Sequence, residues 1–336
     1  MNWDSLEKKH DKNKVLDWLR TFSDQIIEAV YFAKKLKVKK REFDKIVACG
    51  MGGSGIGSAL LRNMLKHELK IPFETFNSYK LPEYVDRKTL VFCVSFSGNT
   101  EETIACYKQA RKKGAYVVSV TTGGWFKKKV KKDIVLEPGI APQPRMGLAY
   151  VCLPQLIVLE RLGLVEKKNT ELGEAVFLLK KEQGKLEEKA KELALKMKGK
   201  LPIFYACDDL ERLAYRFRTD VNENSKQYAL HHFLPEHNHN EINAFSGLKK
   251  GNCHFFFLRH EGESKKIQKR FKVTKKVVGK NFNVTEVHLK GKSLIAATFY
   301  GLQLAALTSY YLSLLNKRDP EPVPMIGLLK KELKKK

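Results

Sequence analysis

Two short turns rich in glycine and hydroxyl side chains carry the residue types that bind a phosphate group. Residues 50–55 are Gly-Met-Gly-Gly-Ser-Gly, and residues 95–100 are Ser-Phe-Ser-Gly-Asn-Thr. Each turn follows an apolar, strand-like stretch and opens a stretch with helical periodicity. Backbone N–H groups at a helix start lack intrahelical partners, and the helix dipole favours an anion there. The pair predicts a site for a small phosphorylated molecule. The predicted phosphate-binding residues are Gly52, Gly53, Ser54, Ser95, Ser97 and Thr100.

Two other interpretations of these turns stay open at this point. Gly50, Gly52 and Gly55 match a dinucleotide fingerprint, and Glu74 follows at the distance of a ribose-binding acid. A nicotinamide-dependent dehydrogenase is therefore an alternative hypothesis. The second turn favours a monophosphate site, because a dinucleotide domain needs no hydroxyl-lined helix start at that strand. The alternative with a purely structural role is that Ser97 and Thr100 only cap a helix.

The composition bounds the class of protein. The chain has 336 residues, which suggests about two domains, and 43% of them are hydrophobic, enough for ordinary cores. Lysine and arginine outnumber aspartate and glutamate by 63 to 37, giving a net charge of +26. The lysine runs are not interleaved with aromatic residues as in a stacking platform, so we expect no nucleic-acid partner.

The cysteines and the apolar segments predict a reduced, cytoplasmic protein that does not enter a membrane. The six cysteines form no CxxC pair, and the N-terminus lacks the basic-then-apolar order of a signal peptide. Residues 293–316 carry no charged residue and could span a bilayer by length. Polar residues are spread through their centre, so we expect a buried helix instead.

Alternating strand and helix patterns predict an α/β fold of two units with mainly parallel sheets. Residues 4–38 predict one or two amphipathic helices, and residues 168–197 predict a long polar helix. The last strand of the first unit should end at Pro138. The predicted strands are 45–50, 71–77, 89–95, 115–120, 133–137, 201–206, 252–259 and 283–289. The predicted helices are 54–67, 100–113, 147–163, 208–224, 263–277, 293–316 and a short one near the end.

Together with the two turns, four later segments resemble one enzyme family. They are residues 142–145 (Pro-Gln-Pro-Arg), 222–226 (Asn-Glu-Asn-Ser-Lys), 238–242 (Asn-His-Asn-Glu-Ile) and 319–330. In this order and spacing they resemble the bifunctional phosphoglucose/phosphomannose isomerases, which are built from sugar isomerase (SIS) domains. The resemblance covers about residues 40–332. It implies two SIS-type three-layer α/β/α units. The expected domains are an N-terminal helical segment (1–40), a first SIS domain (41–165), a linking helix (166–199) and a second SIS domain with a C-terminal helix (200–336).

The resemblance implies a cofactor-free, metal-independent aldose–ketose isomerisation of hexose 6-phosphates through a cis-enediol. Glucose 6-phosphate and fructose 6-phosphate would interconvert, and mannose 6-phosphate with them, in glycolysis and gluconeogenesis. Glu223 matches the family's base, and Arg145 matches its enediolate clamp. His239 and Lys330 match the ring-opening pair. In the family this histidine reaches the neighbouring subunit's site, which implies a homodimer.

Four further points remain open at this stage. His231, His232 and His237 with Glu241 could instead ligate Zn²⁺ or Fe²⁺, or the histidines could only pack or face solvent. In the family, the ability to accept the mannose as well as the glucose epimer at C2 is linked to a threonine shortly before the C-terminal lysine. This chain has no threonine there and has Val323 in that stretch. A non-catalytic sugar-phosphate sensor is the alternative from another class, although the N-terminal residues do not resemble a DNA-binding motif. An aminosugar isomerase is weaker, because no amidotransferase domain accompanies the sequence.

Overall fold

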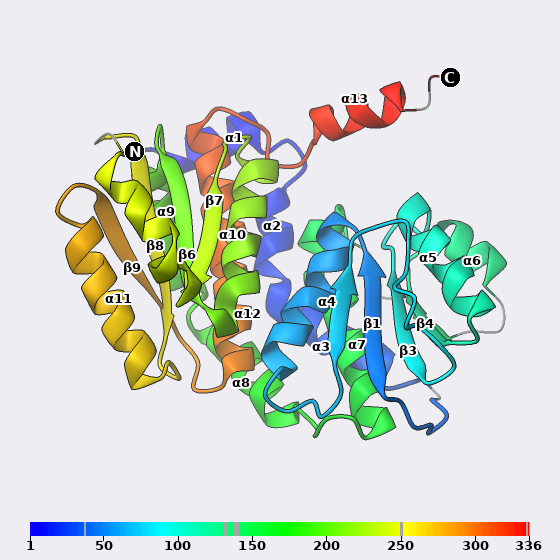
Figure 1. The fold of residues 1–336 in the computed structure, drawn as a ribbon. Coiled ribbons are helices and arrows are strands. Elements are labelled where there is room, and N and C mark those ends of the chain that lie inside the picture. Colours follow the sequence, from blue (N-terminus) through cyan, green and yellow to red (C-terminus); the bar gives the residue numbers. More distant parts are fainter. Residues whose placement is uncertain (37, 131–133, 137–140, 249–250, 334, 336) are drawn as a thin grey trace. The chain divides into compact units, whose positions relative to one another are not determined.

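The computed structural model describes residues 1–36, 38–130, 134–136, 141–248, 251–333 and 335. The chain divides into two compact units, each described here by itself. One unit comprises residues 21–177, and the other comprises residues 1–20 together with 178–336. Each unit contains one parallel β-sheet flanked by helices (Figure 1). The expected α/β fold with parallel sheets is therefore confirmed.

The sheet of the 21–177 unit has five parallel strands in the order β2-β1-β3-β4-β5. The central strands β1 and β3 are almost wholly buried, as expected for parallel strands covered on both faces. Their register pairs Cys49 with Cys93 and Gly50 with Val94, so the two strands end side by side. The strand bounds are β1 Lys45–Gly50, β2 Phe73–Phe76, β3 Thr89–Val94, β4 Tyr116–Val120 and β5 Ile134–Leu136.

Helices cover both faces of this sheet because the chain moves outward from β1 to β2 at one side of the centre and outward from β3 to β4 at the other. Right-handed crossovers place the β1–β2 helix on one face and the β3–β4 helix on the other. Val47, Cys49, Val91 and Cys93 form a core with Cys106 of the helix that follows β3. The helices are α3 Phe22–Ala33, α4 Gly52–Leu65, α5 Glu101–Lys112, α6 Gly124–Lys129, η1 Pro144–Met146 and α7 Leu148–Leu162.

The second unit has a four-stranded parallel sheet in the order β7-β6-β8-β9. Its strands are β6 Leu201–Cys207, β7 Leu230–Leu234, β8 Cys253–His260 and β9 Asn283–Leu289. Its helices are α1 Trp3–His10, α2 Val15–Arg20, α9 Gln183–Met197, η2 Asp208–Leu210, α10 Glu211–Asn224, η3 Glu236–His239, η4 Glu241–Ser246, α11 Lys265–Val278, α12 Leu294–Leu315 and α13 Pro324–Glu332. Helix α8, Asn169–Lys181, crosses the boundary between the units.

Helix α12 is the apolar segment that length alone would have allowed in a bilayer. It is buried on almost every face and packs against α9, α10 and the N-terminal helices. Gln303 donates to the carbonyl of Leu19, and Tyr310 donates to Asp11, so these two polar side chains have partners inside the unit. In the described ranges, no helix combines the length and the apolar character that crossing a membrane requires.

Three expectations about the elements need correction, and one lies partly outside the described residues. Strand β7 was not predicted. The N-terminal segment forms three helices rather than one or two, because Lys14 has φ +54° and Asp11 caps the next helix through the N–H groups of Val15 and Leu16. The long helix over 168–197 is interrupted at Glu182, which has φ −102° and ψ 7°. The predicted end of the 133–137 strand at Pro138 falls outside the described residues.

Candidate active site

The first glycine turn joins β1 to α4 at the carboxyl edge of the five-stranded sheet. Gly52 has φ +50°, a conformation that glycine adopts without strain. A Cβ atom on Gly55 would lie 2.5 Å from the carbonyl oxygen of Gly50, so the turn has no room for a side chain there. The buried Ser54 hydroxyl accepts a hydrogen bond from the N–H of Phe96, 3.0 Å away. Ser54 therefore ties the first turn to the second.

The second turn is organised by its own hydroxyl groups. Buried Ser95 donates through Oγ to the Thr100 hydroxyl at 2.9 Å, and it accepts the Thr100 N–H at 3.4 Å. Ser97 is exposed, and its Oγ accepts the N–H of Asn99 at 3.4 Å. Thr100 caps α5 without a side-chain bond to the helix. Ser95 and Thr100 thus shape the turn, while Ser97 presents its hydroxyl to the outside.

The two turns stand together at the topological switch point of their sheet. Strand order reverses between β1 and β3, and open parallel sheets bind ligands in the crevice beyond the strand ends at such a point. Arg145 reaches the same place from η1, since a Cβ on Gly53 would lie 2.9 Å from the Arg145 backbone nitrogen. The arginine is 5% exposed. The structure therefore brings the phosphate-binding candidates and Arg145 together within one unit.

Sequence reasoning missed the residues that support these turns. Asn77 donates to the Gly50 carbonyl at 2.5 Å, and Thr122 donates to the Phe96 carbonyl at 2.6 Å. The side-chain oxygen of Asn99 accepts the N–H of Trp125 at 2.9 Å. The Thr121-Thr122-Gly123-Gly124 stretch was the available signal, because it follows the next strand of the same sheet.

Glu223 lies in the other unit, one residue before the end of α10. Its neighbour Asn224 donates to the Ser309 hydroxyl at 2.9 Å, and Ser225 donates to the Ser309 carbonyl at 2.7 Å. These bonds fix the end of α10 against α12. Half-buried Glu223 lines a cavity of about 450 Å³ together with Val323. The other residues that line this cavity are Asn222, Lys226, Gln227, Tyr228, Pro324, Met325 and Ile326.

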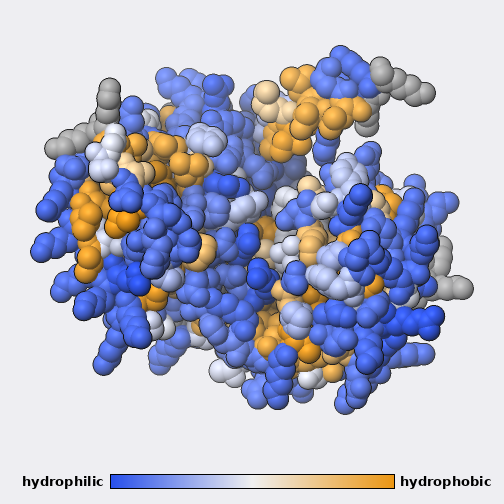
Figure 2. Space-filling model, in the orientation of Figure 1, coloured by the Kyte–Doolittle hydropathy of each residue, from blue (hydrophilic) through white to orange (hydrophobic). Residues whose placement is uncertain are grey.

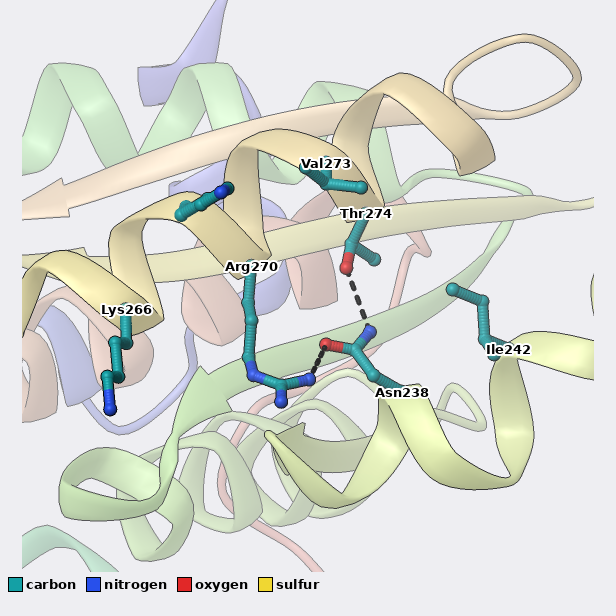
Figure 3. A pocket seen from close by; sticks show the side chains of 7 residues that line it. Asn238, Ile242, Lys266, Arg270, Val273 and Thr274 are labelled. Atoms are coloured by element: carbon teal, nitrogen blue, oxygen red, sulfur yellow. Dashed lines mark hydrogen bonds between the residues drawn. The ribbon is translucent and has the colours of Figure 1, made fainter.

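His239 ends the short helix η3 and is exposed. Its neighbour Asn238 is held by α11. The Asn238 amide donates to the Thr274 hydroxyl at 2.9 Å and accepts from the Arg270 guanidinium at 3.3 Å (Figure 3). A cavity of about 430 Å³ opens between these elements. Helix α11 therefore supports the segment that presents His239, although His239 does not line the Glu223 cavity.

Lys330 lies on α13, whose described residues are all at least partly exposed. It does not line the Glu223 cavity, although the first turn of the same helix does. Apolar side chains are exposed along α13, where Figure 2 shows hydrophobic colouring. They are Met325, Ile326, Leu328 and Leu329. Glu223, His239 and Lys330 thus share a unit but not a pocket.

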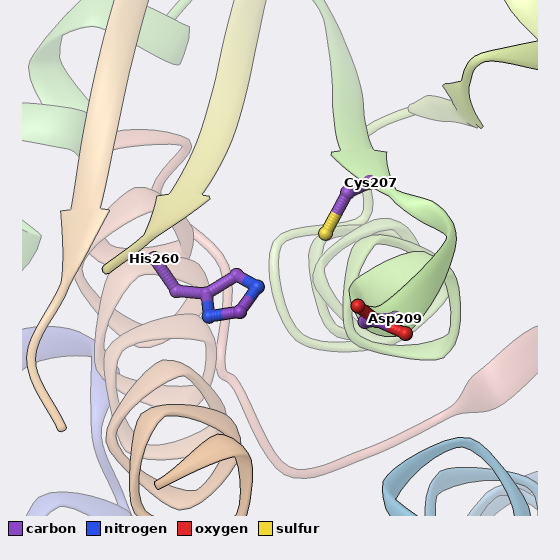
Figure 4. Close-up of side chains that lie close together, drawn as sticks. All are labelled: Cys207, Asp209 and His260. Atoms are coloured by element: carbon purple, nitrogen blue, oxygen red, sulfur yellow. The ribbon is translucent and has the colours of Figure 1, made fainter. Parts of the chain in front are cut away.

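Two groups of side chains in the described residues have the composition of a metal site. Cys207, Asp209 and His260 stand at the ends of β6 and β8 (Figure 4). Burial raises the pKa of the Cys207 thiol to about 12 and lowers the pKa of His260. The other group is His232, His237 and Glu241.

The Glu241 carboxylate has an unusual environment in this second group. Burial acts to raise its pKa, but the neighbouring His237 and the Tyr205 hydroxyl outweigh burial and lower it. The Tyr205 hydroxyl donates to Glu241 Oε1 at 2.5 Å, and the pKa of Tyr205 is raised, first by burial and then by this carboxylate. Glu241 is therefore held as a carboxylate between two imidazoles and a phenol.

Comparison with known proteins identifies the units. Residues 41–163 match the SIS domain model, and residues 186–333 match the model of the bacterial phospho-glucose isomerase C-terminal SIS domain. The bifunctional phosphoglucose/phosphomannose isomerase of Caldicellulosiruptor bescii is 36% identical over 92% of this chain and 96% of its own length. The enzyme of the same name from Thermoplasma volcanium is 33% identical over 93% of this chain and 99% of its own.

Solved structures support the fold. A protein from Clostridium difficile 630 superposes with a TM-score of 0.78 at 17% identity, covering 96% of this chain and 98% of its own. At this identity the likeness bears on architecture alone. It agrees with the pair of parallel sheets and with the arrangement of helices described above.

Proposed function

The chain belongs to the bifunctional phosphoglucose/phosphomannose isomerase family, and we propose that it interconverts fructose 6-phosphate with both glucose 6-phosphate and mannose 6-phosphate. The observation that carries the proposal is the hydrogen bond between the Ser54 hydroxyl and the Phe96 N–H, which joins two phosphate-binding turns at one switch point. The sequence likeness extends over both units. The homologues' activities support an isomerase rather than a dinucleotide-dependent enzyme.

The substrate phosphate would bind at the start of α4. Backbone N–H groups of Gly52 and Gly53 are the donors that such a helix start offers to an anion, and Ser54, whose N–H donates to the Met51 carbonyl at 3.0 Å, would contribute its hydroxyl. Ser95, Ser97 and Thr100 would complete the set from the second turn. This placement leaves the sugar to extend from a fixed phosphate. Binding energy from the non-reacting phosphate can then orient the reacting carbons.

Proton transfer would fall to Glu223. Its carboxylate would take the proton from C2 of the open-chain aldose and return it to C1, while the C2 hydroxyl proton moves to the C1 oxygen. The intermediate is a cis-enediolate, whose negative charge needs a fixed cation. A buried guanidinium such as that of Arg145 is a suitable stabiliser, because water cannot screen it.

Ring opening would precede this step. His239 and Lys330 would move a proton from the C1 hydroxyl to the ring oxygen as the C1–O5 bond breaks. Both residues are exposed in the single chain, and we propose that His239 completes the site of a partner subunit in a homodimer. The exposed apolar side chains of α13 are available to such a partner. The free cysteines support a cytoplasmic location.

The isomerisation is proposed to need no metal on the substrate. The test supplies EDTA-treated protein with fructose 6-phosphate and measures glucose 6-phosphate and mannose 6-phosphate separately. Both products are expected. Failure to form either product both before and after Zn²⁺ is restored, with tight fructose 6-phosphate binding retained, would instead identify a sensor. Val323 gives a matched specificity test: Val323→Leu should reduce mannose 6-phosphate formation more than glucose 6-phosphate formation, because Val323 lines the Glu223 cavity.

A further inference from the structure

Three side chains near the His239 segment converge on one point and have no role in the proposed isomerisation. His232 comes from β7, and His237 and Glu241 come from η3 and η4. One ligand atom from each lies within 4.8 Å of the others. From these contacts we propose that His232, His237 and Glu241 bind one divalent transition-metal ion that fixes the 235–246 segment to the sheet.

The distances suit a common ion. The Nδ1 atom of His232 lies 3.2 Å from Glu241 Oε2, and the Nδ1 atom of His237 lies 3.7 Å from the same oxygen. Ligand atoms each about 2.1 Å from an ion stand about 3–3.5 Å apart at tetrahedral or octahedral angles. These two separations lie within a few tenths of an ångström of this range, and the histidine ligand atoms lie within 4.8 Å of each other.

His237 supplies the second, independent observation. Its side chain is 0% exposed, and neither ring nitrogen makes a hydrogen bond within the described residues. The Nδ1 atom of His232 also lacks one there. Glu241 Oε2 is a charged neighbour of both Nδ1 atoms, but a buried polar group without a hydrogen bond costs about 1–3 kcal/mol, so an imidazole is rarely left in this state. A metal ion coordinated through Nδ1 would give the Nδ1 atom of each ring a partner.

Tyr205 and Phe245 contact the proposed ligands, in the way that residues around a metal site orient the residues that bind the ion. Tyr205 donates to Glu241 Oε1 and leaves Oε2 facing the histidines. The His237 ring packs 4.5 Å from the Tyr205 ring and 5.8 Å from the Phe245 ring, measured between centroids. Such contacts fix ligand orientation and typically change metal affinity by 10- to 100-fold. Two imidazoles and one carboxylate suit Zn²⁺, Fe²⁺ or Co²⁺ rather than Mg²⁺ or Ca²⁺.

The Cys207, Asp209 and His260 group is the competing site, and its chemistry fits less well. The Nδ1 atom of His260 accepts the N–H of Gly262 at 3.2 Å. A neutral ring that accepts at Nδ1 carries its proton on Nε2, the nitrogen that points toward Cys207 and Asp209 in Figure 4. A protonated nitrogen cannot ligate a metal. This group therefore provides the matched control.

The experiment treats full-length protein with EDTA, removes the chelator, and titrates it with Zn²⁺ by calorimetry and with Co²⁺ by absorption. We expect one equivalent to bind and the melting temperature to rise by roughly 3–8 °C at a hundredfold excess over Kd. Glu241→Gln and His232→Gln should each weaken binding by more than tenfold, whereas His260→Gln should not. Glu241 and His232 are partly exposed, so their variants stay informative if a substitution of buried His237 fails to fold.

Several results would overturn the assignment. They are no uptake at micromolar metal, uptake unchanged in both Glu241→Gln and His232→Gln, or loss of uptake in His260→Gln. An intense thiolate-to-cobalt band would also overturn it, because it would place the ion at Cys207. The readout is metal binding rather than turnover, so the proposal can fail while the isomerase proposal stands, and the reverse.

Discussion

At the scale of single residues, the strongest feature is how firmly the candidate base is held. Glu223 lies between Asn222, which accepts the Ala229 N–H at 3.1 Å, and Asn224, which is bonded to α12. These hydrogen bonds hold the backbone that carries Glu223, and the Glu223 side chain lines a cavity. A general base needs such positioning, since proton transfer requires hydrogen-bond distance to the carbon-bound proton.

Replacing the carboxylate while keeping its shape tests this role. Glu223→Gln should reduce kcat by about 10³-fold with little change in KM, because an amide cannot accept the C2 proton. The control is Glu211→Gln at the opposite end of the same helix, which should keep turnover within twofold. Steady-state assays from fructose 6-phosphate give both values. Near-normal kcat in Glu223→Gln would show that another group is the base.

His254 gives a residue-scale prediction about stability. It is 8% exposed, stacks 4.5 Å from the Phe256 ring and bonds the Thr285 hydroxyl at 2.8 Å. Burial, with nearby Lys196 and Lys200, lowers the pKa of His254 from 6.5 to about 4. Between these values the unfolded chain binds more protons than the folded one. Stability is therefore lost as pH falls through this window.

This effect should lower the free energy of unfolding by about 2 kcal/mol between pH 7 and pH 5. Chemical denaturation of the wild type and of His254→Gln across that range isolates the contribution, because glutamine keeps a polar group but does not titrate. The variant should show a shallower pH dependence. Parallel curves for the two proteins would mean that His254 is not protonated selectively in the unfolded chain.

At the scale of elements, the proposed phosphate site depends on turns that only glycine can form. Gly98 has φ +72°, and a Cβ there would lie 1.8 Å from the Gly123 carbonyl oxygen. Gly98→Ala should therefore destabilise the protein by about 3 kcal/mol and raise KM for sugar phosphates.

Gly173→Ala in α8 is the matched control for Gly98→Ala. No atom lies within 4 Å of the Cβ it would add, so it should stabilise by about 0.5–1 kcal/mol. Thermal denaturation and substrate titration measure the two effects. Equal melting temperatures for the two variants would contradict the close approach of the second turn to Gly123.

The same turns show why the sequence predicted some elements and missed others. β1 and β3 are buried on both faces, so continuous apolar runs revealed them and the turns after them. β7 contains His231 and His232 and is only partly buried at the sheet edge, so neither an apolar run nor alternation marked it. The grouping of His232 and His237 with Glu241 as possible metal ligands did not depend on β7, because these residues are close in sequence.

At the scale of the whole molecule, the two units carry complementary halves of the proposed chemistry. The 21–177 unit holds the phosphate turns and Arg145, and the other unit holds Glu223, His239 and Lys330. Motif order along the chain gives the candidate residues of both halves, because each motif is local, and their joint role stays a prediction. The grouping of side chains from separate motifs around a substrate depends on tertiary and quaternary contacts, which no local pattern encodes.

Mixing two inactive variants tests the proposed sharing of His239 across a homodimer. Glu223→Gln and His239→Gln should each be nearly inactive alone. Subunits unfolded and refolded together at equal amounts form hybrids in half of the dimers, and each hybrid has one site with both residues intact. Activity should then recover to about a quarter of the wild-type value. If each chain used its own Glu223 and His239, every site in the mixture would lack one of them, and activity would stay at the level of the separate variants.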